Sequence, residues 1–179
     1  FTNRGAWGRT LNVAAAAAAA TRVVLHPHHM PYRHELSHGL VPGSSVSLSG
    51  VFHNDLVFAL HGAADVDQPF FMHMRGAAGA AATRTVVLNA RDRGVWGAEQ
   101  TIPAGSFPYS KSQRFELQVS IEATRVHIRF GGARGGAPRV VDQTFGYRSQ
   151  GPGEAHALLL GGDSTFEAVT LAGLPTRRP

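Results

Sequence analysis

The sequence predicts an all-β fold, in which two antiparallel sheets pack face to face as a jelly-roll-like β-sandwich. Three observations support this prediction. About ten short apolar runs of strand length follow one another, clusters of Gly, Pro and Asp separate them, and no segment shows the periodicity of an amphipathic helix. Short strands with turn signals between them are typical of sandwiches, because each strand buries one face against the other sheet.

The first expected strands lie in the amino-terminal half of the chain. Apolar residues alternate with serines at 46–51, and short apolar runs follow at 56–60 and 70–74. A turn at 53–55 and a loop at 62–68 separate these three strands. A Gly- and Ala-rich stretch at 76–82 then predicts a flexible loop, which precedes a β-branched strand at 85–89.

The clearest strand signal lies in the second half, at residues 115–121. Apolar and polar side chains alternate strictly there, which is typical of a strand with one buried and one wet face. Residues 125–130 repeat this pattern, and the glycine-rich residues 131–136 predict a hairpin loop. The remaining strands are expected at 140–141, 156–160 and 166–171, with a tight turn at 161–164.

The domain organisation follows from the same pattern. We expect one domain over residues 30–174, an N-terminal arm or linker over residues 1–29, and a short C-terminal tail over residues 175–179. The arm contains seven consecutive alanines at 14–20, too few for a stable isolated helix.

Composition excludes several function classes. Lysine and arginine total 17 against 12 acidic residues, and 16 of the 17 are arginine, so the net charge of +5 comes from guanidinium groups that favour bidentate contacts with anions. No run of five basic residues exists, and we expect no nucleic-acid partner. The absence of cysteine excludes disulfides and thiol chemistry. No apolar run is long enough to cross a bilayer.

Histidines are concentrated near the start of the expected domain. They suggest a metal site, since neutral imidazole is a common ligand of transition metals. The alternative is a surface strand and turn that is rich in histidine. No carboxylates stand at ligand spacing, so the second interpretation is favoured and no metal or other cofactor is expected. The residues concerned are His26, His28, His29, His34 and His38.

Three side chains that can form hydrogen bonds, those of Asn89, Trp96 and Glu99, indicate a binding site. The strand ending at Asn89 is followed by turn residues 91–94, after which Val95 and Trp96 begin another strand, so the hairpin brings Glu99 close to Asn89. The C–H-bearing face of a pyranose stacks on an indole ring, and its hydroxyls need paired donors and acceptors. This arrangement predicts binding of a sugar rather than catalysis.

This stretch resembles the galectins, in which a strand ending in Asn is followed by a Trp-Gly-x-Glu segment on the sugar-binding face. The resemblance covers residues 30–174 and implies the jelly-roll-like sandwich. It also rests on other segments in the expected order, namely Met30-Pro31-Tyr32, Gly39 to Gly43, Val46 to Gly50, Phe107-Pro108-Tyr109, Phe115-Glu116-Leu117, Gly162-Asp163 and Phe166 to Val169.

The resemblance also implies a sugar-binding strand with the pattern His-x-Asn-x-Arg, whose three side chains share one face. The matching residues are His73, Arg75 and Ala77, so the asparagine and the arginine of the pattern are both replaced. Without that arginine, Glu99 loses its partner, and we expect weak or no binding of lactose. Arg75 lies on the same face, and we hypothesise that it pairs with Glu99 and favours sulfated or acidic sugars.

The candidate carbohydrate-binding residues are His73, Arg75, Asn89, Trp96 and Glu99. The first functional hypothesis is a glycan-binding module with weakened or altered β-galactoside specificity, whose partners are galactose-containing or sulfated glycans or glycoproteins. The alternative is a galectin-fold structural or protein-interaction module that has lost sugar binding and contacts proteins through its arm.

We expect no enzyme, because no catalytic motif is recognisable. Family resemblance implies a cytoplasmic location or secretion without a signal peptide.

Overall fold

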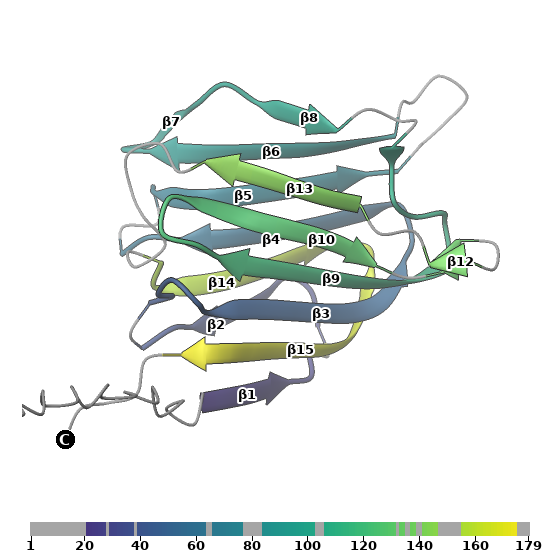
Figure 1. Ribbon diagram of the computed structural model, residues 1–179, viewed down its shortest axis with the longest axis horizontal. Coiled ribbons are helices and arrows are strands. Elements are labelled where there is room, and N and C mark those ends of the chain that lie inside the picture. Colours follow the sequence, from purple (N-terminus) through teal and green to yellow (C-terminus); the bar gives the residue numbers. More distant parts are fainter. Residues whose placement is uncertain are drawn as a thin grey trace, which may run out of the picture.

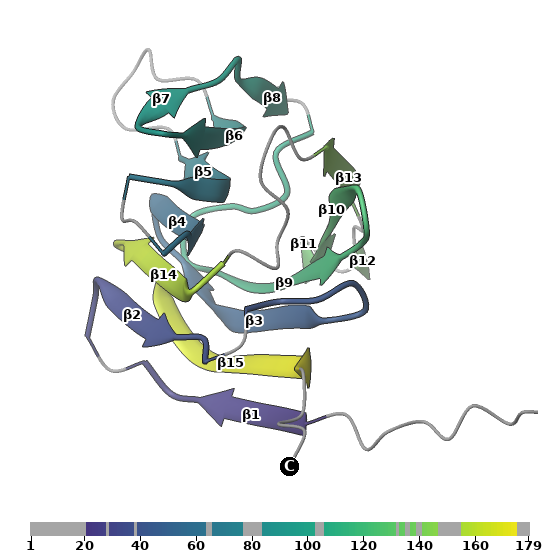
Figure 2. The ribbon, with the colours of Figure 1, turned by 90° about the vertical axis from the view of Figure 1, so that its left-hand side faces the viewer.

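The computed structural model describes residues 21–27, 29–37, 39–63, 66–76, 84–102, 106–131, 133–134, 137–138, 141–146 and 155–174. These residues form two antiparallel sheets that lie over one another as two curved layers (Figures 1 and 2). The architecture is the predicted all-β sandwich. Within the described residues, no helix is both long and apolar enough to span a membrane.

Sheet A has the strand order β1-β15-β3-β9-β10-β13. Its strands are β1 (Thr21–Leu25), β3 (Ser45–Phe52), β9 (Gln113–Ile121), β10 (Arg125–Gly131), β13 (Val141–Gly146) and β15 (Thr165–Leu174).

Sheet B has the order β2-β14-β4-β5-β6-β7, and β8 also pairs with β6. Its strands are β2 (Tyr32–Glu35), β4 (Asp55–His61), β5 (Gln68–Arg75), β6 (Thr85–Asp92), β7 (Val95–Trp96), β8 (Gln100–Ile102) and β14 (Ala157–Gly162).

The core lies between the two sheets. On β9, residues 115, 117, 119 and 121 are buried while most of their neighbours are exposed, as the alternation predicts. Aromatic side chains bridge the layers: Phe70 of β5 contacts Phe145 of β13, with ring centroids 5.6 Å apart. Because one face of every long strand is committed to this core, the opposite face of each sheet is free to carry a site.

The structure differs from the expected elements at several places. Residues 21–25, expected in the arm, form β1 and pair with β15. The expected loop at 131–136 contains β11 (Ala133–Arg134), which pairs with β12 (Ala137–Pro138). Strand β8 was not expected.

Residues 1–20 and 28 of the predicted arm lie outside the described residues. So do the predicted tail at 175–179, most of the predicted loop at 76–82, and Val140.

Candidate functional site

Two neighbouring strands of sheet B carry candidate side chains on their outer face. On β5, Phe70, Met72 and Met74 are fully buried, and the residues between them, Phe71 and His73, are only partly buried. Strand β6 pairs with β5 so that Asn89 stands opposite Phe71 and Val87 opposite His73. His73, Arg75 and Asn89 therefore share the outer face, as the period of two predicts.

The hairpin after β6 brings Trp96 to the same face. The turn was expected at residues 91–94, but β6 continues to Asp92 and the turn is made by Arg93 and Gly94. Their φ angles of 48° and 80° suit a two-residue hairpin turn whose twist matches that of the strands. Trp96 pairs with Arg91 in this hairpin, and 44% of its surface is exposed.

A groove with a volume of about 340 Å³ lies over these strands. Phe71 packs edge-on against the Trp96 indole at 5.1 Å, and the Arg91 guanidinium lies 5.2 Å from the indole centroid, a cation–π contact. We call this hollow the Trp96 groove. The residues that line it are Phe71, Arg75, Val87, Asn89, Trp96, Gly97 and Glu99.

Asn89 lines the groove and also bonds to the backbone of the chain. Only 4% of its surface is exposed. Its Oδ1 accepts a hydrogen bond from the backbone N–H of Ala90 at 2.8 Å, and its Nδ2 donates to the carbonyl of Gly97 at 3.2 Å. Asn89 therefore fixes the segment between β7 and β8, which positions Trp96 and Glu99 relative to β6.

His73 and Arg75 are bonded to each other. Arg75 Nε donates to His73 Nδ1 at 3.0 Å, and His73 Nε2 lies 2.5 Å from Asp55 Oδ1. The hypothesised pair between Arg75 and Glu99 does not form among the described side chains, although both line the groove. Ala77, the third position of the family pattern, lies outside the described residues.

The structure adds side chains that were not identified from the sequence. Phe71, Val87 and Gly97 line the Trp96 groove, and Asp55 bonds to His73. Phe71 lies two residues before His73, so the strand period contained the signal that places it on the same face. Asp55 follows from no local pattern, because its contact depends on how β4 pairs with β5.

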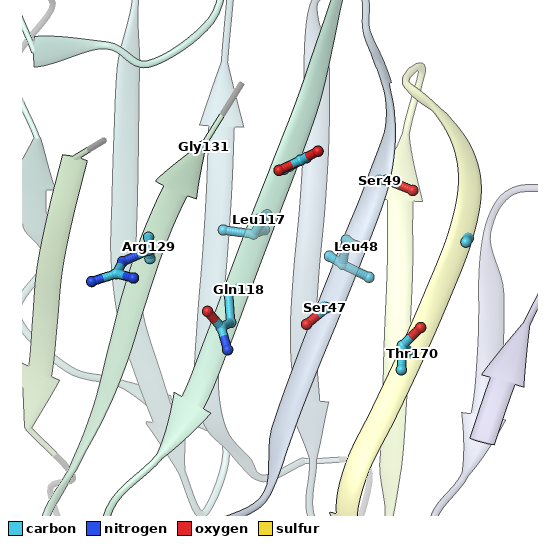
Figure 3. A pocket seen from close by; sticks show the side chains of 10 residues that line it. Ser47, Leu48, Ser49, Leu117, Gln118, Arg129, Gly131 and Thr170 are labelled. Carbon is cyan, nitrogen blue, oxygen red and sulfur yellow. The ribbon is translucent and has the colours of Figure 1, made fainter. Parts of the chain in front are cut away.

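A second hollow lies on the outer face of sheet A, with a volume of about 280 Å³ (Figure 3). Side chains from four adjacent strands line it, among them Ser47, Gln118, Arg129 and Thr170. None of its lining residues is aromatic. It therefore offers hydroxyl, amide, carboxylate and guanidinium groups but no ring on which a sugar could stack.

The histidine-rich segment contains β2, in keeping with the strand interpretation. His26 is exposed and its Nδ1 lies 3.0 Å from the carbonyl of Glu167. Among the described residues, no group of three or more His, Asp or Glu could hold a metal ion. His28 and His38 lie outside the described residues.

Comparison with known proteins shows the family and the fold of the chain. The family model of galactoside-binding lectins matches residues 31–169. A search of curated proteins gives no match.

Two solved structures share the fold. Galectin LEC-6 of Caenorhabditis elegans is 15% identical, with a TM-score of 0.64, over 83% of this chain and 94% of that one. Sheep galectin-11, solved with glycerol, is 20% identical, with a TM-score of 0.60, over 78% of this chain and 96% of that one. Since the family model covers most of the chain, the protein belongs to the galactoside-binding lectin family, the galectins.

Proposed function

We propose that this galectin domain binds glycans in the Trp96 groove with altered specificity, favouring galactose-containing glycans that carry a sulfate or another anionic group. The observation that carries the proposal is the composition of the groove. A half-exposed indole, a guanidinium and a carboxylate line one hollow on sheet B, from Trp96, Arg75 and Glu99. We propose no catalytic step.

The indole and the charged groups have different tasks in this proposal. The Trp96 ring supplies apolar area for the C–H face of a pyranose. Glu99 accepts hydrogen bonds from sugar hydroxyls, and Arg75 donates to oxygens that carry negative charge, because guanidinium groups bind oxyanions with charge-assisted hydrogen bonds.

Ordinary lactose is expected to bind weakly. The family's asparagine is Arg75 here and its arginine is Ala77. Each lost charge-assisted hydrogen bond removes about 1.5–3 kcal/mol, at least about tenfold in affinity. An anionic substituent on the sugar offsets part of this loss by binding Arg75.

A glycan array that includes lactose, sulfated lactose and sialylated lactose tests the proposal. We expect the strongest signals from the anionic sugars and their loss in the Trp96→Ala variant. A matched control is Gln118→Ala, which alters the hollow of sheet A and is expected to keep the wild-type signals. Signals that survive Trp96→Ala would show that another surface is the receptor.

One observation favours a second candidate function, a galectin-fold interaction module without sugar binding. Both ring nitrogens of His73 and both polar atoms of the Asn89 amide already have partners within the chain. A wild-type protein that retains its fold but gives no signal on the array and no retention on a lactose column would support this second function over the first.

A further inference from the structure

Asp55 occupies an unusual place beside the Trp96 groove. It is the first residue of β4 and the direct ladder partner of Arg75 on β5. Opposite charges that face each other across two strands commonly form an ion pair. Here the imidazole of His73 lies between them instead, bonded through Nε2 to the Asp55 carboxylate and through Nδ1 to Arg75 Nε.

The two contacts determine the tautomer of His73. A guanidinium can only donate hydrogen bonds, so Nδ1 must accept and cannot carry a proton. Nε2 therefore carries the ring hydrogen and donates it to Asp55. Since both nitrogens are used within the chain, the ring has no free N–H to offer a ligand.

The backbone of Asp55 is held from another part of the fold. Its N–H donates to Asp163 Oδ1 at 2.7 Å, and its carbonyl accepts from the N–H and the Oγ of Ser164 at 3.1 and 2.7 Å. Gly162, with a φ of +94°, allows this close approach, because a Cβ there would lie 2.5 Å from the Asp55 carbonyl oxygen. The turn between β14 and β15 thus fixes the position of Asp55.

We propose that Asp55 is a specificity-determining residue of the Trp96 groove. It holds His73 in the tautomer that accepts from Arg75, which makes His73 a positioning residue rather than a ligand contact. The four remaining N–H donors of Arg75, a residue that lines the groove, then bind a sulfate or carboxylate group on the sugar. This inference rests on the proposed function and names the residues that would set its preference.

Two variants of Asp55 separate its possible roles. Asp55→Ala removes the acceptor for His73 Nε2–H, whereas Asp55→Asn keeps an acceptor oxygen without the charge. Asp55→Thr serves as a second truncation if the alanine variant does not fold, because Thr suits a strand and its hydroxyl is too short to replace the carboxylate. Thermal unfolding checks that each variant is folded.

The first measurement is the tautomer of His73. Long-range nitrogen–proton spectra of protein with nitrogen-15 histidine distinguish the two ring tautomers, and a His73→Gln variant identifies the signal. We expect the Nε2–H form in the wild type and in Asp55→Asn, and a mixture of tautomers in Asp55→Ala and Asp55→Thr.

The second measurement is the affinity for lactose, 3′-sulfolactose and 3′-sialyllactose by titration calorimetry. The sulfated and sialylated sugars separate the two sources of an oxyanion. We expect the preference for the anionic sugar over lactose to fall about tenfold in Asp55→Ala and Asp55→Thr. In Asp55→Asn we expect the preference to be kept or raised, because the acceptor for His73 remains while the repulsion of the anion by the carboxylate is removed.

A wild-type preference that is unchanged in the folded truncation variants, with the wild-type tautomer retained, would overturn the role of Asp55 and leave the proposed function standing. A wild type that binds none of the three sugars would instead overturn the proposed function and this inference with it. The two failures are therefore distinguishable in one set of titrations.

Discussion

The outer faces of the two sheets are built by the same strand alternation and carry hollows of comparable volume, about 340 Å³ on sheet B and about 280 Å³ on sheet A. Their chemistry differs. The Trp96 groove contains two aromatic rings, Phe71 and Trp96, while the hollow of sheet A contains serine, threonine and glutamine side chains among its lining residues. Strand geometry thus supplies a hollow on either face, and an aromatic platform makes one of them suitable for a sugar.

Charged side chains line both hollows, Glu116 and Arg129 on sheet A and Arg75 and Glu99 on sheet B. On sheet A, Arg114 pairs with Glu167 at 2.6 Å, and Arg125 pairs with Glu122 at 2.5 Å. In the Trp96 groove, Arg75 donates to Nδ1 of His73, and among the described residues Glu99 forms no ion pair. The groove therefore keeps charged groups that a ligand can engage.

The sharpest way to break this comparison is Trp96→Ala. Loss of the stacking face is expected to remove about 2 kcal/mol of binding free energy, or about 30-fold in Kd for 3′-sulfolactose. Stability is expected to change little, because the side chain is 44% exposed. Calorimetry measures the Kd, and Gln118→Ala on sheet A provides the control with wild-type affinity.

The next largest effect is expected from Glu99→Gln. The amide keeps an acceptor oxygen but loses the charge, so we expect lactose binding to weaken about tenfold. Binding of 3′-sulfolactose is expected to weaken less, since removing a carboxylate also removes repulsion of the sulfate. Equal losses for the two sugars would contradict the assignment of separate tasks to Glu99 and Arg75.

The fold was accessible from sequence wherever the pattern was local. Residues 115–121 alternate strictly, and β9 (Gln113–Ile121) lies there. Residues 21–25 were predicted to belong to the arm because a five-residue segment without turn signals has the same sequence pattern in an arm and in a sheet. They form strand β1 because they pair with β15, which is distant in the sequence. The predicted turn at 91–94 begins two residues too early, because Arg91 and Asp92 are polar but belong to β6 and pair with Trp96 and Val95.

The candidate site shows the same division. The period of two predicted that His73 and Arg75 share one face, and the hairpin predicted that Trp96 and Glu99 lie near Asn89. Four of the five candidates line the Trp96 groove; His73 does not line it and bonds to Asp55 instead. No local pattern predicts which side chain each of these residues contacts. Arg75 bonds to His73 and not to Glu99, which depends on the register of β4 against β5.

A smaller effect is expected from the pH dependence of stability at Asp163, which lies in the turn between β14 and β15. Burial alone would raise the pKa of Asp163, but hydrogen bonds from the Asn54 N–H, the Asn54 amide and the Asp55 N–H, together with nearby His53, lower it below 3.8. A lowered pKa stabilises the fold above the unfolded value, and the contribution is lost as pH falls through the folded value.

Asp163→Asn is therefore expected to lower the free energy of unfolding at neutral pH. The difference from the wild type should shrink between about pH 5 and pH 2 as the wild-type carboxylate is protonated. Urea unfolding at several pH values measures this difference. A constant difference across that range would mean that the charge of Asp163 does not contribute to stability.

The smallest effect is expected from Arg114→Ala on sheet A. The Arg114 side chain is 77% exposed, and exposed ion pairs contribute about 0.2–1 kcal/mol at most. We expect a fall of less than about 0.5 kcal/mol in the free energy of unfolding and no change in glycan affinity. A clear loss of glycan affinity in Arg114→Ala would mean that the sugar binds to sheet A and not in the Trp96 groove.

The most direct test of the central claim is an NMR titration of the nitrogen-15 protein with 3′-sulfolactose. If the Trp96 groove is the receptor, the largest shift changes will fall on the Trp96 indole N–H and on the backbone amides of Val87, Gly97 and Glu99. Shift changes confined to Ser47, Ser49 and Thr170, or none at all in the folded protein, would contradict the account.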